Sequence, residues 1–142
     1  MLVRHVLDRK GHATHAIGPD ATVLDALKVM AEHEIGALLV MQGDRVLGVM
    51  SERDYARKVA LLGRASRDTP VSQIMSSPPV TVTPADTIDG CMRLVTDKRI
   101  RHLPVIDADK NVLGILSIGD VVKEIASQQK FIINQLETYI SG

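Results

Sequence analysis

The stretch GILSIGD, residues Gly114–Asp120, has the pattern of a buried strand that runs into the start of a helix. The stretch GVMSERD, Gly48–Asp54, carries glycine, serine and aspartate at the same three places. A serine followed three residues later by an acidic residue, ahead of an apolar helix, is typical of a capping box. The chain therefore contains the same strand-to-helix corner twice, and its fold must accommodate two of them.

The two corners belong to a longer repeat. An offset of 65 residues matches Pro19 with Pro84 and Thr22 with Thr87, and one extra residue near Ala108 changes the offset to 66. The matched pairs that follow are Gly48 with Gly114, Ser51 with Ser117, Asp54 with Asp120 and Ala60 with Ala126. Because the same residues recur in the same order, the sequence predicts two copies of one structural unit.

Each copy predicts the order β-α-β-β-α. A short extended piece comes first, and a threonine (Thr22 or Thr87) then caps a helix with an apolar stripe. Two strands joined by a polar turn form a hairpin, and the final helix leaves from the corner. The predicted strands are Thr14–Ile17, Ala37–Met41 and Val46–Met50 in the first copy, and Val80–Thr83, Leu103–Ile106 and Val112–Leu116 in the second.

One copy of this size buries too little surface to be stable alone, so two copies should pack together around a pseudo-two-fold axis. We expect an α+β fold with the first repeat and a lead-in helix at residues 1–63, a linker and second lead-in at 64–79, and the second repeat at 80–127. A C-terminal helix is expected at 128–142. Five of its residues share one face and make it a candidate interaction helix: Phe131, Ile132, Gln135, Leu136 and Tyr139.

Composition argues against several classes of function. Seventeen basic residues balance seventeen acidic ones, and aromatic residues make up only 2%, so neither a nucleic-acid footprint nor a base-stacking surface is predicted. The single cysteine, Cys91, permits no internal disulfide and favours a reducing compartment. No apolar run is long enough for a membrane span, and the charged N-terminus does not resemble a signal peptide. We expect a cytoplasmic protein.

No catalytic or metal-binding motif stands out. His5, His12 and His15 gather near the start, but they lack the spacing and the partners of a metal site. Neither a Walker motif nor a dinucleotide-binding glycine motif is present, and no nucleophile–base pair is visible. The sequence therefore predicts no metal site, no catalytic cofactor and no enzymatic activity.

With the repeat established, the chain resembles a pair of CBS domains, the module named after cystathionine β-synthase and called a Bateman module when paired. The segment Arg99–Val122, RIRHLPVIDADKNVLGILSIGDVV, is similar to the commonest form of that domain. The segment IGALLVMQGDRVLGVMSERDYARKV, which begins at Ile35, is a near match. The resemblance covers about residues 1–127 and implies a stand-alone regulatory module that binds an adenine nucleotide (AMP, ADP, ATP, NAD(H) or an S-adenosyl compound) in clefts between the repeats.

The resemblance also implies roles for individual residues. Asp54 and Asp120 would hold ribose hydroxyls, and Ser51 and Ser117 would reach ribose or phosphate. Arg101 and His102 match phosphate-binding positions; the first copy has Gly36 and Ala37 there, but has Arg53 where the second has Gly119. The adenine would lie between the first extended piece of a repeat and the strand after its first helix, and the residues concerned are Thr14, His15, Ala16, Gly36 and Ala37, or Val80, Thr81, Val82, His102, Leu103 and Pro104.

These residue types suit a nucleotide. A carboxylate can accept two hydrogen bonds from a ribose diol, an arginine can hold phosphate in a bidentate way, and aliphatic walls suit adenine. Two alternatives stay open. Each serine–aspartate pair could do no more than cap a helix. The protein could also be a homodimeric interaction protein with empty nucleotide sites; self-association, and a regulated protein of unknown identity, are expected under either view.

Overall fold

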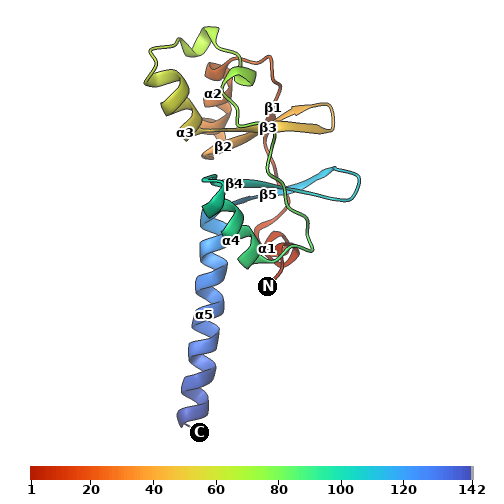
Figure 1. The fold of residues 1–142 in the computed structure, drawn as a ribbon, viewed down its shortest axis with the longest axis vertical. Coiled ribbons are helices and arrows are strands. Elements are labelled where there is room, and N and C mark those ends of the chain that lie inside the picture. Colours follow the sequence, from red (N-terminus) through yellow and green to blue (C-terminus); the bar gives the residue numbers. More distant parts are fainter. Residues whose placement is uncertain (142) are drawn as a thin grey trace.

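The computed structural model describes residues 1–141 and contains two similar halves, each a small sheet with helices on its outer side (Figure 1). This arrangement confirms the expected α+β fold of two β-α-β-β-α units. After the lead-in helix α1 (Val3–Lys10), the first half comprises β1 (Ala16–Ile17), α2 (Val23–His33), β2 (Ala37–Gln42), β3 (Arg45–Ser51) and α3 (Glu52–Tyr55). The second comprises α4 (Ile88–Asp97), β4 (His102–Ile106), β5 (Val112–Ser117) and α5 (Ile118–Ser141).

The sheets follow the predicted order with one difference. In the first half β1 pairs in parallel with β2, which pairs in antiparallel with β3. In the second half β4 and β5 form the antiparallel hairpin, but the strand expected at Val80–Thr83 shrinks to a single bridge between Val82 and Val105. Prolines at 78, 79 and 84 flank that segment, and a residue without an N–H cannot extend a ladder.

The helix starts are as predicted. The Thr22 hydroxyl accepts a hydrogen bond from the Asp25 N–H at 3.1 Å, and the Thr87 hydroxyl accepts one from the Gly90 N–H at 3.0 Å. Each bond satisfies one of the free N–H groups in the first turn of its helix.

The final helices of the two repeats differ. In the first repeat, α3 gives way after Tyr55 to a π-helical turn, Ala56–Ala60. In the second repeat, α5 runs for 24 residues without a break. The helix expected at 128–142 is therefore, as far as Ser141, the second half of α5 rather than a separate element.

The two halves exchange their lead-in segments. Val3, Val6 and Leu7 of α1 pack into the core of the second repeat, although they precede the first in sequence. In return, Val71 and Ile74, from the 3₁₀ turn Val71–Gln73 and the residue after it, pack into the core of the first. A third cluster between the sheets joins the halves: Ala37, Leu39, Val49, Val112 and Ile115. Each lead-in thus covers the sheet of the other repeat, which ties the repeats into one body.

The shared glycine of each corner is explained by this exchange. A Cβ on Gly48 would lie 2.6 Å from the Ser76 carbonyl oxygen, and a Cβ on Gly114 would lie 2.8 Å from a Leu7 methyl group. Real Cβ atoms do not approach other atoms so closely, so a lead-in can cross the strand only where the side chain is missing. The glycine therefore belongs to the packing of the repeat rather than to the turn.

Beyond Ser127, α5 leaves the body and projects away from it (Figure 1). The exposed large apolar side chains of this projecting part are Phe131, Ile132, Ile133, Leu136, Tyr139 and Ile140. Within residues 1–141, no helix combines the length and the apolar character that crossing a bilayer demands.

Candidate functional site

Both corners form the predicted capping box. At the first, the Asp54 N–H donates to the Ser51 hydroxyl at 3.1 Å, and the Ser51 N–H donates to the Asp54 carboxylate at 3.0 Å. At the second, the Asp120 N–H donates to Ser117 at 3.1 Å, and the Ser117 N–H donates to Asp120 at 2.8 Å. The serine and aspartate therefore have a structural role in both repeats, and any ligand role is additional.

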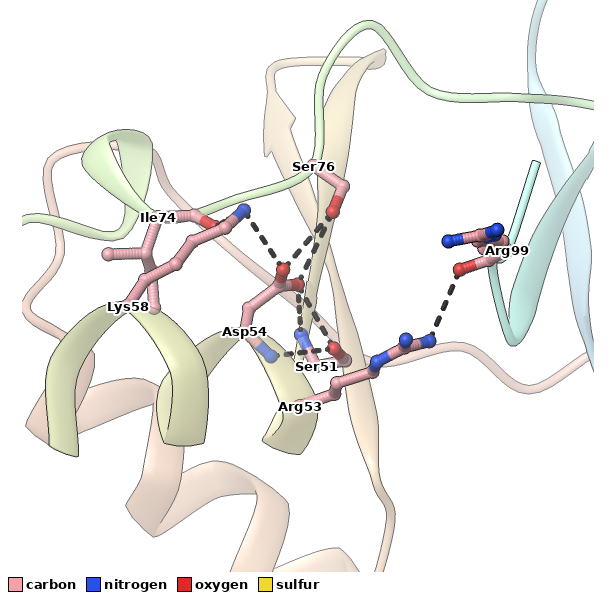
Figure 2. Close-up of polar contacts among 7 residues, drawn as sticks. All are labelled: Ser51, Arg53, Asp54, Lys58, Ile74, Ser76 and Arg99. Atoms are coloured by element: carbon pink, nitrogen blue, oxygen red, sulfur yellow. Dashed lines mark hydrogen bonds and ion pairs between the residues drawn. The ribbon is translucent and has the colours of Figure 1, made fainter. Parts of the chain in front are cut away.

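The first corner opens into a cleft between the repeats with a volume of about 430 Å³. Its walls come from three places: the corner and the turn after it, the linker around Ser76 to Val80, and the segment Lys98 to His102 that leads into β4. The Arg53 guanidinium reaches across and donates to the Arg99 carbonyl oxygen at 3.2 Å (Figure 2). Both repeats therefore contribute to one site, as expected for this architecture.

The cleft is strongly basic. Its lining contains one carboxylate, Asp54, and six permanently charged cations: Arg53, Arg57, Lys58, Lys98, Arg99 and Arg101. Like charges crowded around a concave surface raise the local positive potential and attract anions. The cleft is therefore suited to a ligand with phosphate or another multiply charged anion.

Asp54 is nearly buried and well satisfied (Figure 2). One carboxylate oxygen accepts from the Ser51 N–H and hydroxyl, both at 3.0 Å. The other receives the Lys58 ammonium at 3.1 Å and the Ser76 hydroxyl at 3.2 Å. Since a carboxylate has about four acceptor positions, a ribose hydroxyl would have to replace one of these partners. The long bond from neutral Ser76 is the weakest of them.

The second corner has a different partner. The Lys10 ammonium lies 2.5 Å from the Asp120 carboxylate and also donates to the Ile115 carbonyl oxygen at 2.7 Å. Burial alone would raise the pKa of Asp120, but hydrogen bonds from Lys10 and Ser117 hold it below its ordinary value. Asp120 is thus ionised and bound to a cation of its own chain.

The lead-ins explain this asymmetry. The repeat offset matches Lys10 with Met75 and His12 with Ser77. His12 contacts the Leu113 carbonyl oxygen at 2.8 Å, and Ser77 donates to the equivalent carbonyl of Leu47, also at 2.8 Å. The two lead-ins therefore follow corresponding backbone paths. Because Lys10 stands where the other lead-in has Met75, a lead-in cation reaches Asp120 but not Asp54.

His102 lies between the two corners. It pairs with Ser117 across the second hairpin and also lines the cleft of the first corner. Burial and the neighbouring charges of Lys10 and Arg101 lower the pKa of His102, although Asp120 and Asp54 act in the opposite direction. His102 is therefore neutral at pH 7.

The structure brings only part of the predicted site together. Six predicted residues line the basic cleft: Ser51, Arg53, Asp54, Val80, Arg101 and His102. Thr81 lines a different cleft, between the two hairpin turns, and Gly36 lines a shallow hollow beside Glu52. Val82, Leu103 and Pro104 are buried. Ala37 is buried in the cluster between the sheets. The remaining residues belong to the start of the first repeat or to the corner of the second: Thr14, His15, Ala16, Ser117, Gly119 and Asp120.

His15, one of these, stacks on His33 with ring centroids 3.8 Å apart. No group of three or more metal-ligating side chains occurs in residues 1–141. The three N-terminal histidines therefore form no such cluster in the described chain.

Sequence reasoning missed several residues of the cleft. Arg57 and Lys58 follow Asp54 by three and four residues, and that helical spacing could have placed them beside it. Ser76, Lys98 and Arg99 carried no such signal, because their position depends on the path of the linker and on the packing of one repeat against the other.

Comparison with known proteins agrees with this architecture. The family model for the CBS domain matches residues 12–61 and 71–127. The chain is 43% identical over 128 residues to the mitochondrial CBS domain-containing protein CBSX3 of Arabidopsis thaliana, covering 87% of this chain and 62% of that relative. It is 31% identical to the CBS domain-containing protein YhcV of Bacillus subtilis, covering 74% of each chain. A cytoplasmic location stays a prediction, since one relative is named as mitochondrial.

Solved structures share the fold. The crystal structure of the CBS domain protein NE2398 is 46% identical, with a TM-score of 0.83, and the match covers 89% of this chain and 98% of that one. The CBS domain pair of protein MJ0100, solved with 5′-methylthioadenosine and S-adenosyl-L-methionine, has a TM-score of 0.78 at 19% identity and shows the likeness of fold alone. With two matched repeats, close relatives and a common architecture, the chain belongs to the CBS domain family.

Proposed function

We propose that the protein is a regulatory module that senses an adenine nucleotide such as AMP, ATP or NAD(H), bound in the basic cleft of the first corner. The observation that carries this proposal is the cleft itself. Six cations from both repeats line it together with Asp54, the aspartate expected to bind the ribose. CBS pairs are commonly regulatory. The CBS domain pair of protein MJ0100, which shares the fold at 19% sequence identity, was solved with two adenosyl compounds.

In the proposed complex, each part of the ligand meets matching chemistry. The phosphates lie against Arg53 of the first repeat and Arg101 of the second, which both line the cleft. A ribose hydroxyl donates to Asp54 in place of Ser76. The adenine lies against the apolar wall formed by Pro78, Pro79 and Val80.

The second corner takes no ligand in this proposal. A ribose diol that uses both carboxylate oxygens of Asp120 would have to compete with the Lys10 ammonium at Oδ2, and a bond between opposite charges costs more to replace than the Ser76 hydroxyl bond at Asp54. The residues at the second repeat's own phosphate positions, Arg101 and His102, line the basic cleft of the first corner instead. We therefore propose one nucleotide per chain.

The bound nucleotide regulates by joining the repeats. Its phosphates neutralise cations on both walls, so it favours the conformation in which the walls are close, and it shifts an equilibrium only by that difference in affinity. A partner protein that binds one conformation better would sense the nucleotide. No catalytic group is part of the proposal.

Calorimetry with AMP and with adenosine tests the proposal. Arg101→Met should weaken AMP binding about tenfold, since a charge-assisted contact contributes roughly 1.5 kcal/mol or more, and should leave adenosine binding nearly unchanged. Arg45→Met, an exposed arginine away from this cleft, is the matched control. Absence of heat with AMP, ATP, NAD(H) and S-adenosylmethionine at millimolar concentrations would refute nucleotide sensing.

The second candidate is a homodimeric interaction protein whose nucleotide site stays empty. The exposed apolar half of α5 favours it. The same titrations separate the two functions, because an interaction protein self-associates without responding to any nucleotide.

A further inference from the structure

The last fourteen described residues of α5, 128–141, extend beyond the body for about 21 Å at the helical rise of 1.5 Å per residue. Five of their apolar side chains fall within an arc of about 120° on a helix of 3.6 residues per turn. We call them the tail stripe: Ile132, Ile133, Leu136, Tyr139 and Ile140, all more than half exposed. A helix face of this kind is stable in water only when another surface covers it.

The tail stripe has the spacing of a helix-pairing seam. Ile133, Leu136 and Ile140 follow the three-then-four spacing of core positions in a coiled coil. On one side of this seam lie Ile132 and Tyr139, seven residues apart. On the other side lie Lys130 and Glu137, also seven apart, and these are the only charged residues between 128 and 141. One flank is thus apolar and the other carries one charge of each sign.

We propose that this half of α5 pairs with the same segment of a second copy of the chain, in antiparallel orientation. When two copies of a helix run antiparallel, like flanks meet. Lys130 of each chain then faces Glu137 of the other, and Ile132 faces Tyr139. In a parallel pair opposite flanks would meet, which would place Lys130 and Glu137 against apolar side chains. Charge complementarity therefore selects the antiparallel arrangement.

The base of the helix offers room for the tip of the second copy. A groove of about 530 Å³ lies between the N-terminal segment and α5 and includes Met1, Gln128, Phe131 and Ile132. Matching Ile133 of one chain with Leu136 of the other places the last turn of the second copy beside Gln128. Tyr139 of that copy then lies next to Ile132, which belongs to both the groove and the tail stripe. The apolar surface is continuous from the seam into the groove.

This pairing goes beyond nucleotide binding and does not depend on it. Light scattering of the full-length chain should give at least twice the 15.5 kDa mass of one chain. Leu136→Glu places a charge in the centre of the seam and should halve the measured mass. Asn134→Glu puts the same group on the opposite face of α5 and should change nothing. Far-ultraviolet circular dichroism and the urea midpoint verify that both variants keep the folded body.

Charge reversal tests the orientation. Lys130→Glu alone should weaken self-association about tenfold, because two attractive pairs per dimer become repulsive ones. The double variant Lys130→Glu, Glu137→Lys should restore the wild-type value. A monomeric wild type, or a Leu136→Glu variant of unchanged mass, would overturn the pairing. A double variant as weak as the single one would overturn the antiparallel arrangement.

Discussion

Replacing Lys10 with methionine probes the contact that distinguishes the second corner from the first. Methionine keeps most of the length of the side chain and its helix propensity but removes the ammonium group that binds Asp120 and the Ile115 carbonyl. A hydrogen bond to a charged group contributes about 1.5–3 kcal/mol when buried, and an exposed ion pair contributes about 1 kcal/mol or less. Because about a third of the Lys10 side chain is exposed, we expect a loss of about 1–2 kcal/mol at pH 7.

The pH dependence of this loss carries the sharper information. The pKa of Asp120 is held below its ordinary value of 3.8, so the unfolded chain binds this proton more readily than the folded chain. The stabilisation is therefore complete above about pH 4 and disappears as the pH falls through the folded-state pKa. The difference in stability between wild type and Lys10→Met should be full at pH 7 and should shrink steadily towards pH 3.

Thermal denaturation measures both quantities. For a chain of this size, 1–2 kcal/mol corresponds to a fall in Tm of roughly 3–6 °C at pH 7. Lys28→Met, which removes an exposed lysine of α2, is the matched control and should leave Tm within about one degree. An equal loss at pH 7 and pH 3, or no loss at pH 7, would show that Lys10 does not stabilise the folded chain through Asp120.

Two further predictions concern stability. Gly48→Ala should cost about 2–3 kcal/mol in urea denaturation, because its Cβ would lie 2.6 Å from the Ser76 carbonyl oxygen, whereas Gly18→Ala, with no atom within 4 Å, should be nearly neutral. Equal effects of the two alanines would contradict the crossing of the lead-in over β3. The lowered pKa of His102 means that the folded chain binds this proton less readily than the unfolded chain, so stability should fall as the pH drops from 7 to 5. His102→Gln should reduce that fall, and a variant with the wild-type slope would show that His102 does not cause it.

The outline of the fold was predictable because its signals are local and occur twice. Thr22 and Thr87 cap the helices where a threonine before an apolar stripe predicts a cap. The hairpins follow from alternating strands around polar turns. The strand expected at Val80–Thr83 was largely wrong, since neighbouring prolines limit it to one bridge.

Parts of the fold that depend on the pairing of the repeats were not predictable. Sequence order assigns α1 to the first repeat, yet Leu7 packs into the second. The continuity of α5 was missed as well. The two corners have the same motif, and that motif does not indicate that α3 ends after one turn whereas α5 continues for 24 residues.

The candidate site also combines local features that the sequence predicts with long-range contacts that it does not. The Ser51–Asp54 corner and Arg53 are local features, and all three residues line one cleft. The contacts of Ser76 with Asp54 and of Lys10 with Asp120 join segments 22 and 110 residues apart. No local pattern predicts such contacts. These distant partners, and not the shared motif, make the two corners chemically different.

The most direct test of the account is the number of AMP molecules bound per chain, measured by calorimetry on the wild type, Asp54→Asn and Asp120→Asn. We predict one AMP per chain in the wild type. Asp54→Asn should weaken it about 10- to 100-fold, the effect of removing a hydrogen bond to a charged acceptor, while Asp120→Asn should leave both affinity and number unchanged. Binding that is lost in Asp120→Asn and kept in Asp54→Asn would contradict the account.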